Sequence, residues 1–144
     1  MNGRLWILKS GKNRGESIME KIRFNKFTSR IGDNSIIVRL IKLSDVVLVD
    51  DMLKCNYAVG VMYDARFDKK PHLTYVAKGE EARRMIRLAK VNGIEVQLIP
   101  MLVQGIVSKT NCEIGGEIPR EFYRITAYVL STVHIKELKK HNLL

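Results

Sequence analysis

The sequence predicts an α/β domain in which a small mixed sheet of about four strands is flanked by helices. Two short runs rich in β-branched residues, 45–50 and 57–64, have the pattern of strands that are buried on both faces. Between residues 73 and 100 a strand, a helix and a strand follow one another directly, which indicates a right-handed parallel crossover. The 144 residues suffice for one such domain and its core.

The first part of the chain is basic and irregular. Residues 1–43 hold ten lysines and arginines against three acids, whereas residues 44–144 hold fifteen against twelve. Residues 1–15 mix glycines with basic side chains and show no sustained period, and a short amphipathic helix is expected within residues 16–31. We therefore predict a basic, linker-like or loosely attached segment over residues 1–43 and a folded domain over residues 44–144.

The folded domain should begin with a strand pair. The runs 45–50 and 57–64 are too short for helices and are bounded by turn residues, so we expect them to pair, with residues 51–56 as the connection. Residues 65–72 form a charged loop in this interpretation. The run 73–79 is then a third strand, which ends at Gly79.

Helices should alternate with the last strand. Residues 80–92 carry acids in their first turn, and Gly93 follows where a C-terminal cap is expected. Residues 94–100 form the fourth strand, a short helix follows Pro100, and Pro119 opens a long helix that closes the core. The apolar stripes of the two longer helices are Ala82, Met85, Ile86 and Ala89, and Phe122, Ile125, Val129 and Val133.

Composition argues against a membrane-spanning or secreted chain. The longest apolar stretch, 35–49, is interrupted by Arg39, Lys42 and Asp45, so it falls short of the roughly 20 apolar residues that a bilayer span requires. The apolar run near the N-terminus is too short for a secretory signal. We expect a cytoplasmic protein.

Neither a metal site, a cofactor nor a disulfide framework is indicated. Cys55 and Cys112 lie far apart and lack metal-binding spacing, and no phosphate-binding glycine loop follows a predicted strand. The histidines are scattered over a loop, a helix and the tail, at positions 72, 134 and 141.

The loop that leads into the second strand, with the sequence DDMLKCN, is the segment most open to a catalytic interpretation. Cys55 could be a nucleophile, but Lys54 alone is weak support for an activated thiolate, so a half-buried structural thiol is favoured. Asp50 and Asp51 could be a carboxylate pair, but adjacent side chains on a strand point to opposite faces. Acids are common where a strand ends and a turn begins, so the turn alone explains their presence. Asn56 could cyclise onto its own carbonyl, although the amide of a strand residue is no special leaving group.

A basic nucleic-acid-binding module is a second hypothesis for the function. Arg83, Arg84, Arg87 and Lys90 lie opposite the apolar stripe of the predicted helix 80–92. The basic N-terminal segment would also suit a phosphate backbone or an anionic membrane surface. A solvated helix face and a solvated linker are the alternatives, and a steep salt dependence of binding to DNA or RNA would separate them.

Three segments resemble a known family in their order and spacing. They are YAVGVMYD at 57–64, VAKGEEARRMIRLAKVNGIEVQLIPML at 76–102 and EIGGEIPREFYRITAYVL at 113–130. Together they resemble the cytoplasmic domain of the type III secretion and flagellar export-apparatus switch proteins, the FlhB/YscU/SpaS family. The resemblance covers roughly residues 44–138.

The resemblance implies a non-enzymatic domain that binds export-apparatus components or exported substrates and takes part in switching substrate specificity. In the family, a basic linker joins this domain to a four-helix membrane domain beneath the export gate, so residues 1–43 would correspond to the linker and could associate with the inner face of the membrane. The 144 residues contain no counterpart of the membrane domain, so the chain would be either a fragment of a longer protein or a stand-alone relative.

The family cleaves its own backbone in an Asn-Pro-Thr-His turn immediately before the strand that matches residues 57–64. The four corresponding positions here are Leu53, Lys54, Cys55 and Asn56, and none of them matches. Without the Asn-Pro bond, we predict that autocleavage of the family kind is absent.

The family also implies a surface on which exported subunits dock. Its positions correspond here to Pro71, Val103 and Ile106. The segment LVQGI at 102–106, which contains the last two, keeps the apolar residues and loses the arginine of the family pattern. The alternative is that Val103 and Ile106 simply pack in the core.

Overall fold

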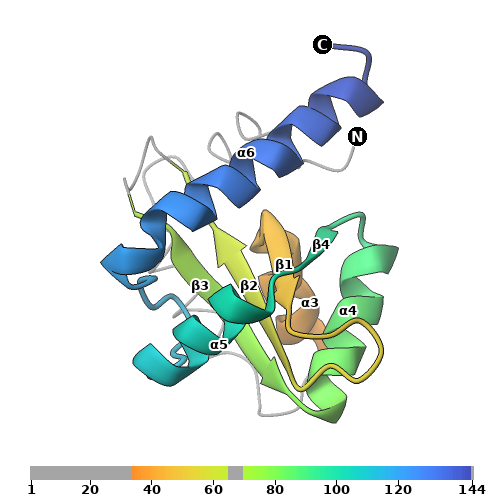
Figure 1. Ribbon diagram of the computed structural model, residues 1–144. Helices are drawn as coiled ribbons and strands as arrows, with labels where there is room; N and C mark the ends of the chain where they lie inside the picture. Colours follow the sequence, from red (N-terminus) through yellow and green to blue (C-terminus); the bar gives the residue numbers. More distant parts are fainter. Residues whose placement is uncertain (1–33, 65–69, 144) are drawn as a thin grey trace.

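A computed structural model describes residues 34–64 and 70–143 of the chain (Figure 1). The arm and the short helix predicted within residues 1–31 lie outside this part. The elements are α3 (Asn34–Leu43), β1 (Val46–Val49), β2 (Tyr57–Met62), β3 (His72–Lys78), α4 (Glu80–Val91), β4 (Glu95–Leu98), α5 (Pro100–Lys109), the 3-10 helix η1 (Arg120–Phe122) and α6 (Tyr123–Lys140).

The four strands form one mixed sheet with the order β3-β2-β1-β4. β2 pairs antiparallel with both β1 and β3, whereas β4 pairs parallel with β1. The predicted sheet of about four strands is therefore confirmed, as is the pairing of the first two strands. α4 carries the chain from β3 at one edge to β4 at the other, and both of these strands run in the direction of β1.

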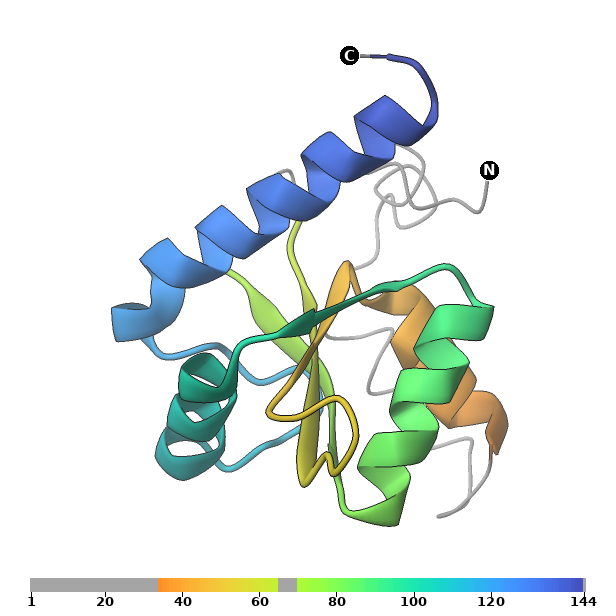
Figure 2. The ribbon, with the colours of Figure 1, turned by 45° about the vertical axis from the view of Figure 1, so that its right-hand side comes forward.

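The sheet lies between two layers of helices (Figure 2), and an apolar core fills each side. Val47 and Val49 of β1 face the layer formed by α3 and α4, and Val46 and Leu48 face the layer formed by α5 and α6. Because successive side chains of a strand point to opposite faces, a run of four apolar residues supplies both cores at once. All four residues are fully buried, which confirms the prediction of a strand covered on both faces.

Helix α3 corrects the predicted domain boundary. The sequence placed residues 34–43 in a basic, loosely attached segment, but they form a helix that packs on the sheet through Ile37, Leu40 and Ile41. Ser44 ends this helix, since its backbone N–H donates to Ile41 O at 2.9 Å and its hydroxyl donates to Leu40 O at 3.0 Å. The folded unit thus begins at or before Asn34.

Helix α4 agrees closely with its prediction. Its buried residues are the four of the predicted stripe, and Gly93 adopts a left-handed φ of 72° just beyond its end.

The predicted start of the last helix is wrong. Pro119 precedes η1 and not the first turn of α6, which begins four residues later. No helix in the described ranges, 34–64 and 70–143, is long and apolar enough to cross a bilayer.

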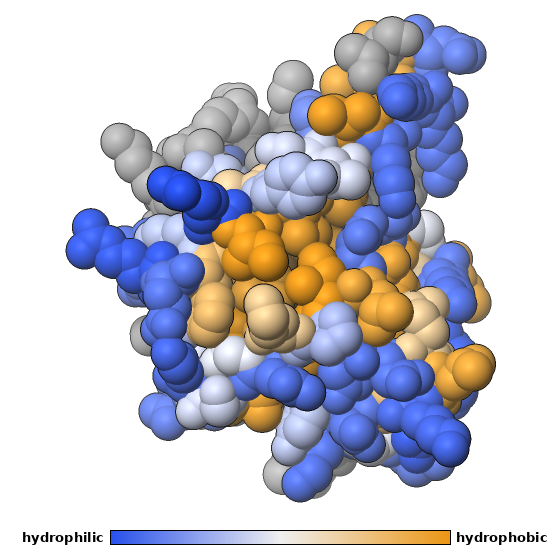
Figure 3. Space-filling view, viewed as in Figure 1, coloured by the Kyte–Doolittle hydropathy of each residue, from blue (hydrophilic) through white to orange (hydrophobic). Residues whose placement is uncertain are grey.

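Strand β4 is an edge of the sheet in the part of the chain that the structure describes. It is only four residues long. The carboxylate of Glu95, at the start of β4, accepts a hydrogen bond from Gln97 at 2.8 Å. The same carboxylate forms an ion pair with Lys136 of α6 at 2.8 Å. Apolar side chains gather near this edge, over β4 and the start of α5 (Figure 3), where Leu98 and Met101 are exposed.

Gly60 of β2 lies against the side chains of Ser44, Thr74 and Met85, the last of which belongs to α4. A Cβ at this position would overlap the hydroxyl of Thr74 and come within 2.7 Å of the Ser44 hydroxyl. These two hydroxyls form a buried hydrogen bond of 2.5 Å, and the methyl of Met85 lies just beyond. The absence of a side chain at residue 60 therefore permits this polar contact inside the core.

We expect Gly60→Ala to lower the free energy of unfolding by about 2 kcal/mol, as measured by urea denaturation, because overpacking of a filled core costs roughly 1–3 kcal/mol. The matched variant is Gly60→Ala combined with Thr74→Ala, which removes the overlapped hydroxyl. The double variant should lose less stability than the sum of the two single losses. Strict additivity would contradict the steric explanation.

Candidate functional site

The loop between β1 and β2 is held by the two acids at its start. The Asp51 carboxylate accepts hydrogen bonds from the backbone N–H groups of Leu53 at 2.7 Å and Lys54 at 2.8 Å. The Asp50 carboxylate accepts from the N–H groups of Asn56 at 3.0 Å and Tyr57 at 3.3 Å. Both acids thus satisfy turn amides, which agrees with a turn and not with a catalytic carboxylate pair.

The electrostatics of Asp51 follow from these contacts. Hydrogen bonds from the Lys54 and Leu53 amides lower the pKa of its carboxyl below the ordinary value of 3.8, because they stabilise the ionised form. The charged carboxylate is therefore the form that holds the turn at neutral pH.

Cys55 is a buried structural thiol. Its side chain is fully inaccessible, and the thiol donates to Tyr57 O at 3.1 Å. Burial, followed by the hydrogen bond and charge of Asp50, raises the pKa of this thiol, so the reactive thiolate is disfavoured. The hypothesis of a nucleophilic cysteine has no support in this environment.

Helix α4 and its cap fix the other side of the same loop. Arg83 donates to Cys55 O at 3.2 Å, and the N–H of Gly79 donates to Asn56 O at 2.8 Å. Cyclisation of Asn56 would require its side-chain amide to attack its own backbone carbonyl. That carbonyl is held in the backbone hydrogen bond from Gly79. Leu53, at 87% exposure, is the most exposed side chain of the loop among its large apolar residues.

Two of the four basic residues on the exposed face of α4 form local ion pairs. Arg83 lies 2.7 Å from Glu80 and Arg84 lies 3.5 Å from Glu81, each at a spacing of three residues along the helix. Such pairs are typical of a solvated helix face. The geometry therefore gives no specific support to the nucleic-acid hypothesis.

The three predicted docking residues do not form one surface. Val103 and Ile106 are fully buried in the core between the sheet and helices α5 and α6. This is the alternative that the sequence left open, and it follows because residues 102, 103 and 106 form the inner face of α5. Pro71, in contrast, lines a pocket beside α6.

That pocket, which we call the apolar pocket, has a volume of about 400 Å³ and lies between the start of β3, the end of β2 and one face of α6. Its walls are mostly aromatic and aliphatic. The residues that line it are Tyr63, Pro71, Tyr123, Ala127, Leu130, Ser131 and His134.

A second pocket adjoins the first one at Tyr123, which lines both. We call it the basic pocket, because three of its lining side chains are basic and one is acidic. Its volume is about 670 Å³. The residues that line it are Lys70, Lys109, Thr110, Glu117, Ile118, Pro119, Arg120 and Tyr123.

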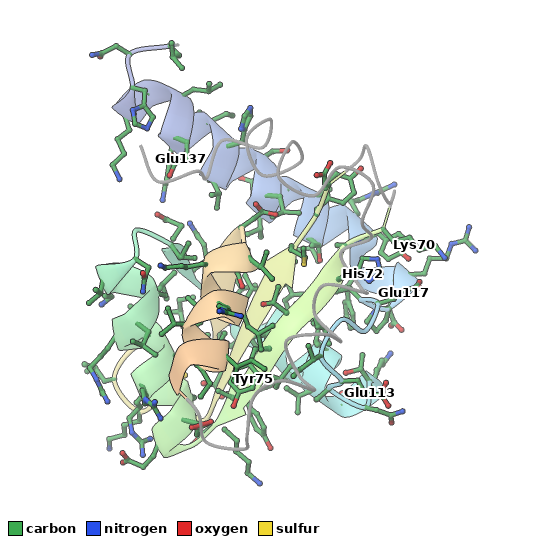
Figure 4. The ribbon with its side chains drawn as sticks, turned by 180° about the vertical axis from the view of Figure 1, so that it is seen from behind. Lys70, His72, Tyr75, Glu113, Glu117 and Glu137 are labelled. Carbon is green, nitrogen blue, oxygen red and sulfur yellow. The ribbon has the colours of Figure 1, made fainter. Side chains whose placement is uncertain are left out.

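The connector before η1 contributes Glu117 and Ile118 to the basic pocket and is hydrogen-bonded to Pro71 of the apolar pocket. Residues 115–118 add to the start of β3 through backbone hydrogen bonds, among them Leu73 N–H to Gly116 O at 2.7 Å and Ile118 N–H to Pro71 O at 3.2 Å. His72 is buried, at the start of β3 and not in a loop as the sequence suggested, and its Nδ1 lies 3.1 Å from Gly115 O. Figure 4 shows Lys70, His72 and Glu117 gathered at this corner.

Sequence reasoning found only Pro71 among the residues of the apolar pocket. The spacing of Tyr123, Ala127, Leu130 and His134 on α6 was a usable signal, because residues three and four apart share a helix face. Tyr63 carried no such signal, since only the fold brings the end of β2 to this helix. Within residues 34–64 and 70–143, no group of three or more His, Cys, Asp or Glu side chains could hold a metal ion.

Comparison of the chain with known proteins finds one matching family model and several solved structures with a similar fold. The model of the FlhB HrpN YscU SpaS Family matches residues 21–133. The crystal structure of the cytoplasmic domain of FlhB from Shewanella putrefaciens has a TM-score of 0.67 and 21% identity, over 77% of this chain and 81% of that one. A mutated EscU C-terminal domain has a TM-score of 0.61 and 20% identity, over 72% and 94%. No curated protein matches the chain.

A second EscU C-terminal domain, also mutated, has a TM-score of 0.60 and 22% identity, over 67% of this chain and 98% of that one. At such identities the likeness concerns the fold. The predicted architecture, a mixed sheet with flanking helices, is thereby confirmed.

We expect Asp51→Ala to increase the rate of amide hydrogen exchange at Leu53 and Lys54, measured by NMR at neutral pH, because their acceptor is removed. In the unchanged protein the same protection should persist above the ordinary Asp pKa of 3.8 and be lost as the pH falls through the lower pKa of the folded state. Glu113→Ala, which removes an exposed acid outside this loop, is the control. Equal exchange in both variants would refute the role of Asp51.

Proposed function

Because this chain belongs to the FlhB, HrpN, YscU and SpaS family, we propose that it is a type III export-switch domain that binds export-apparatus proteins or exported polypeptides and performs no turnover chemistry. The fold that it shares with the FlhB cytoplasmic domain and the EscU C-terminal domain supports this proposal. It works by docking, and the docking site is the apolar pocket beside α6.

The observation that carries this proposal is the composition and position of the apolar pocket. Two tyrosines and a proline line it together with one face of α6, and its volume of about 400 Å³ fits one large apolar side chain of a bound chain. Aromatic walls bury such a side chain with little loss of their own conformational freedom. Protein partners that insert an anchor into a pocket of this kind gain most of their affinity there.

Val103 and Ile106 serve this site indirectly in our proposal. They belong to the same apolar core as Leu130, which lines the pocket, so they fix α5 and α6 relative to the sheet. Their full burial keeps them from touching a partner directly. Pro71 is the residue of the predicted set that would contact it.

The loop 50–56 should remain uncleaved. Leu53, the position that corresponds to the asparagine of the family motif, has no side-chain nucleophile, and Lys54 follows it in place of proline. The amide of Lys54 is hydrogen-bonded to Asp51. This chain therefore lacks both the attacking group and the scissile bond of the family, and any switching by this domain proceeds without a cut at this loop.

We expect Ala127→Trp to weaken docking, because the indole at this exposed position of α6 would fill the apolar pocket without altering the core. The measurement is affinity capture from the native cell followed by identification of type III export-gate proteins, secretion-ATPase subunits and exported polypeptides. Recovery should fall at least about fivefold, which corresponds to about 1 kcal/mol.

Lys139→Trp, on an exposed part of α6 outside both pockets, is the matched control and should leave recovery unchanged. Equal recovery with Ala127→Trp would rule out the pocket as the docking site. Recovery of none of these export components by the unchanged protein would overturn the functional proposal.

Intact-mass measurement of the purified protein after prolonged incubation should show a single uncleaved species. The full-length mass calculated from the sequence is the reference for the uncleaved species. Two spontaneous fragments that end and begin between Asp50 and Tyr57 would disprove the absence of self-cleavage.

A further inference from the structure

The basic pocket adjoins the proposed docking site directly. Tyr123, the first residue of α6, lines both pockets, and Pro119 and Ile118 continue the apolar surface into the second one. A polypeptide that places a side chain in the apolar pocket can therefore extend past Tyr123 into the basic pocket. The chemistry of the second pocket then bears on which chains can dock.

The basic pocket favours an anion. Lys70, Lys109 and Arg120 line it against the single acid Glu117, so the formal charge of its lining is positive. Among residues 34–64 and 70–143, no carboxylate lies within ion-pair distance of the exposed Arg120 guanidinium. Arg120 can thus offer its planar donor fork to a carboxylate without giving up an ion pair.

The two lysines of this pocket are held in pairs that water can replace. Lys70 lies 3.3 Å from Glu117, and Lys109 lies 2.6 Å from Glu121, with about half of each side chain exposed. Exposed ion pairs contribute little to stability, so a lysine can exchange its partner for an arriving carboxylate at small cost. Lys109 also lies 5.8 Å from the centre of the Phe122 ring, which helps to keep it beside the pocket.

We propose that the chain docks polypeptide segments in which an acidic side chain lies close in sequence to an apolar anchor. The apolar side chain occupies the apolar pocket, and the carboxylate occupies the basic pocket near Arg120. Charge complementarity to Arg120, Lys70 and Lys109 is what selects such segments. This inference rests on the proposed docking function and specifies its preferred ligand.

The test uses a panel of fluorescein-labelled twelve-residue peptides that carry one leucine anchor and a single Glu at successive positions on either side of it. Each peptide has a partner in which Gln replaces Glu. Binding to the full chain is measured by fluorescence anisotropy at low salt. We expect the best Glu peptide to bind about fivefold more tightly than its Gln partner, and this preference to shrink at high salt.

Arg120→Glu should remove or reverse the preference for Glu over Gln. Arg124→Glu is the matched control, since it makes the same change of charge at a nearby exposed position that lines neither pocket, and it should keep the preference. Circular dichroism of both variants checks that the fold is unchanged.

The outcomes separate this inference from the function on which it rests. Binding that Ala127→Trp weakens but that is equal for Glu and Gln peptides overturns the acidic preference and leaves the docking function standing. An equal loss of preference in Arg124→Glu and Arg120→Glu also overturns it. Absence of binding by every peptide of the panel overturns both the inference and the docking site.

Discussion

Burial of strand β1 on both faces is the constraint on which the rest of the domain depends. Four consecutive apolar residues have no exposed surface, and their side chains alternate between two cores. A strand of this kind requires a covering layer on each side and a hydrogen-bonded neighbour at each edge. Helices α3 and α4 cover one face, α5 and α6 cover the other, and β2 and β4 supply the neighbours.

This constraint also places the candidate sites. β1 ends at the loop 50–56, and its register with β4 sets Val49 beside Leu98, so α5 must begin close to that loop. α6 packs on the same face of the sheet as α5 and brings Tyr123, Ala127 and Leu130 next to Pro71 at the start of β3. The two pockets lie where α6 meets the connector 115–118.

Much of the fold could be predicted from local sequence patterns. The β-branched runs 45–50 and 57–64 predicted the first two strands. The spacing of residues 82, 85, 86 and 89 identified the buried face of α4. α3 was missed, although Ile37, Leu40 and Ile41 have helical spacing, because the basic composition of the preceding residues suggested a linker. The pockets could not be predicted, since they join residues such as Tyr63 and His134 that only the tertiary fold brings together.

The short edge strand β4 has a further physical consequence. An unpaired strand edge offers its peptide groups to any other chain, and exposed Leu98 and Met101 beside it would strengthen such contact. A length of four residues and a charged cover, formed by Glu95 of β4 and Lys136 of α6, limit this template. Through Lys136, the last helix places a charge beside this edge, which is one of the ways in which a sheet edge is made less favourable for pairing with another chain.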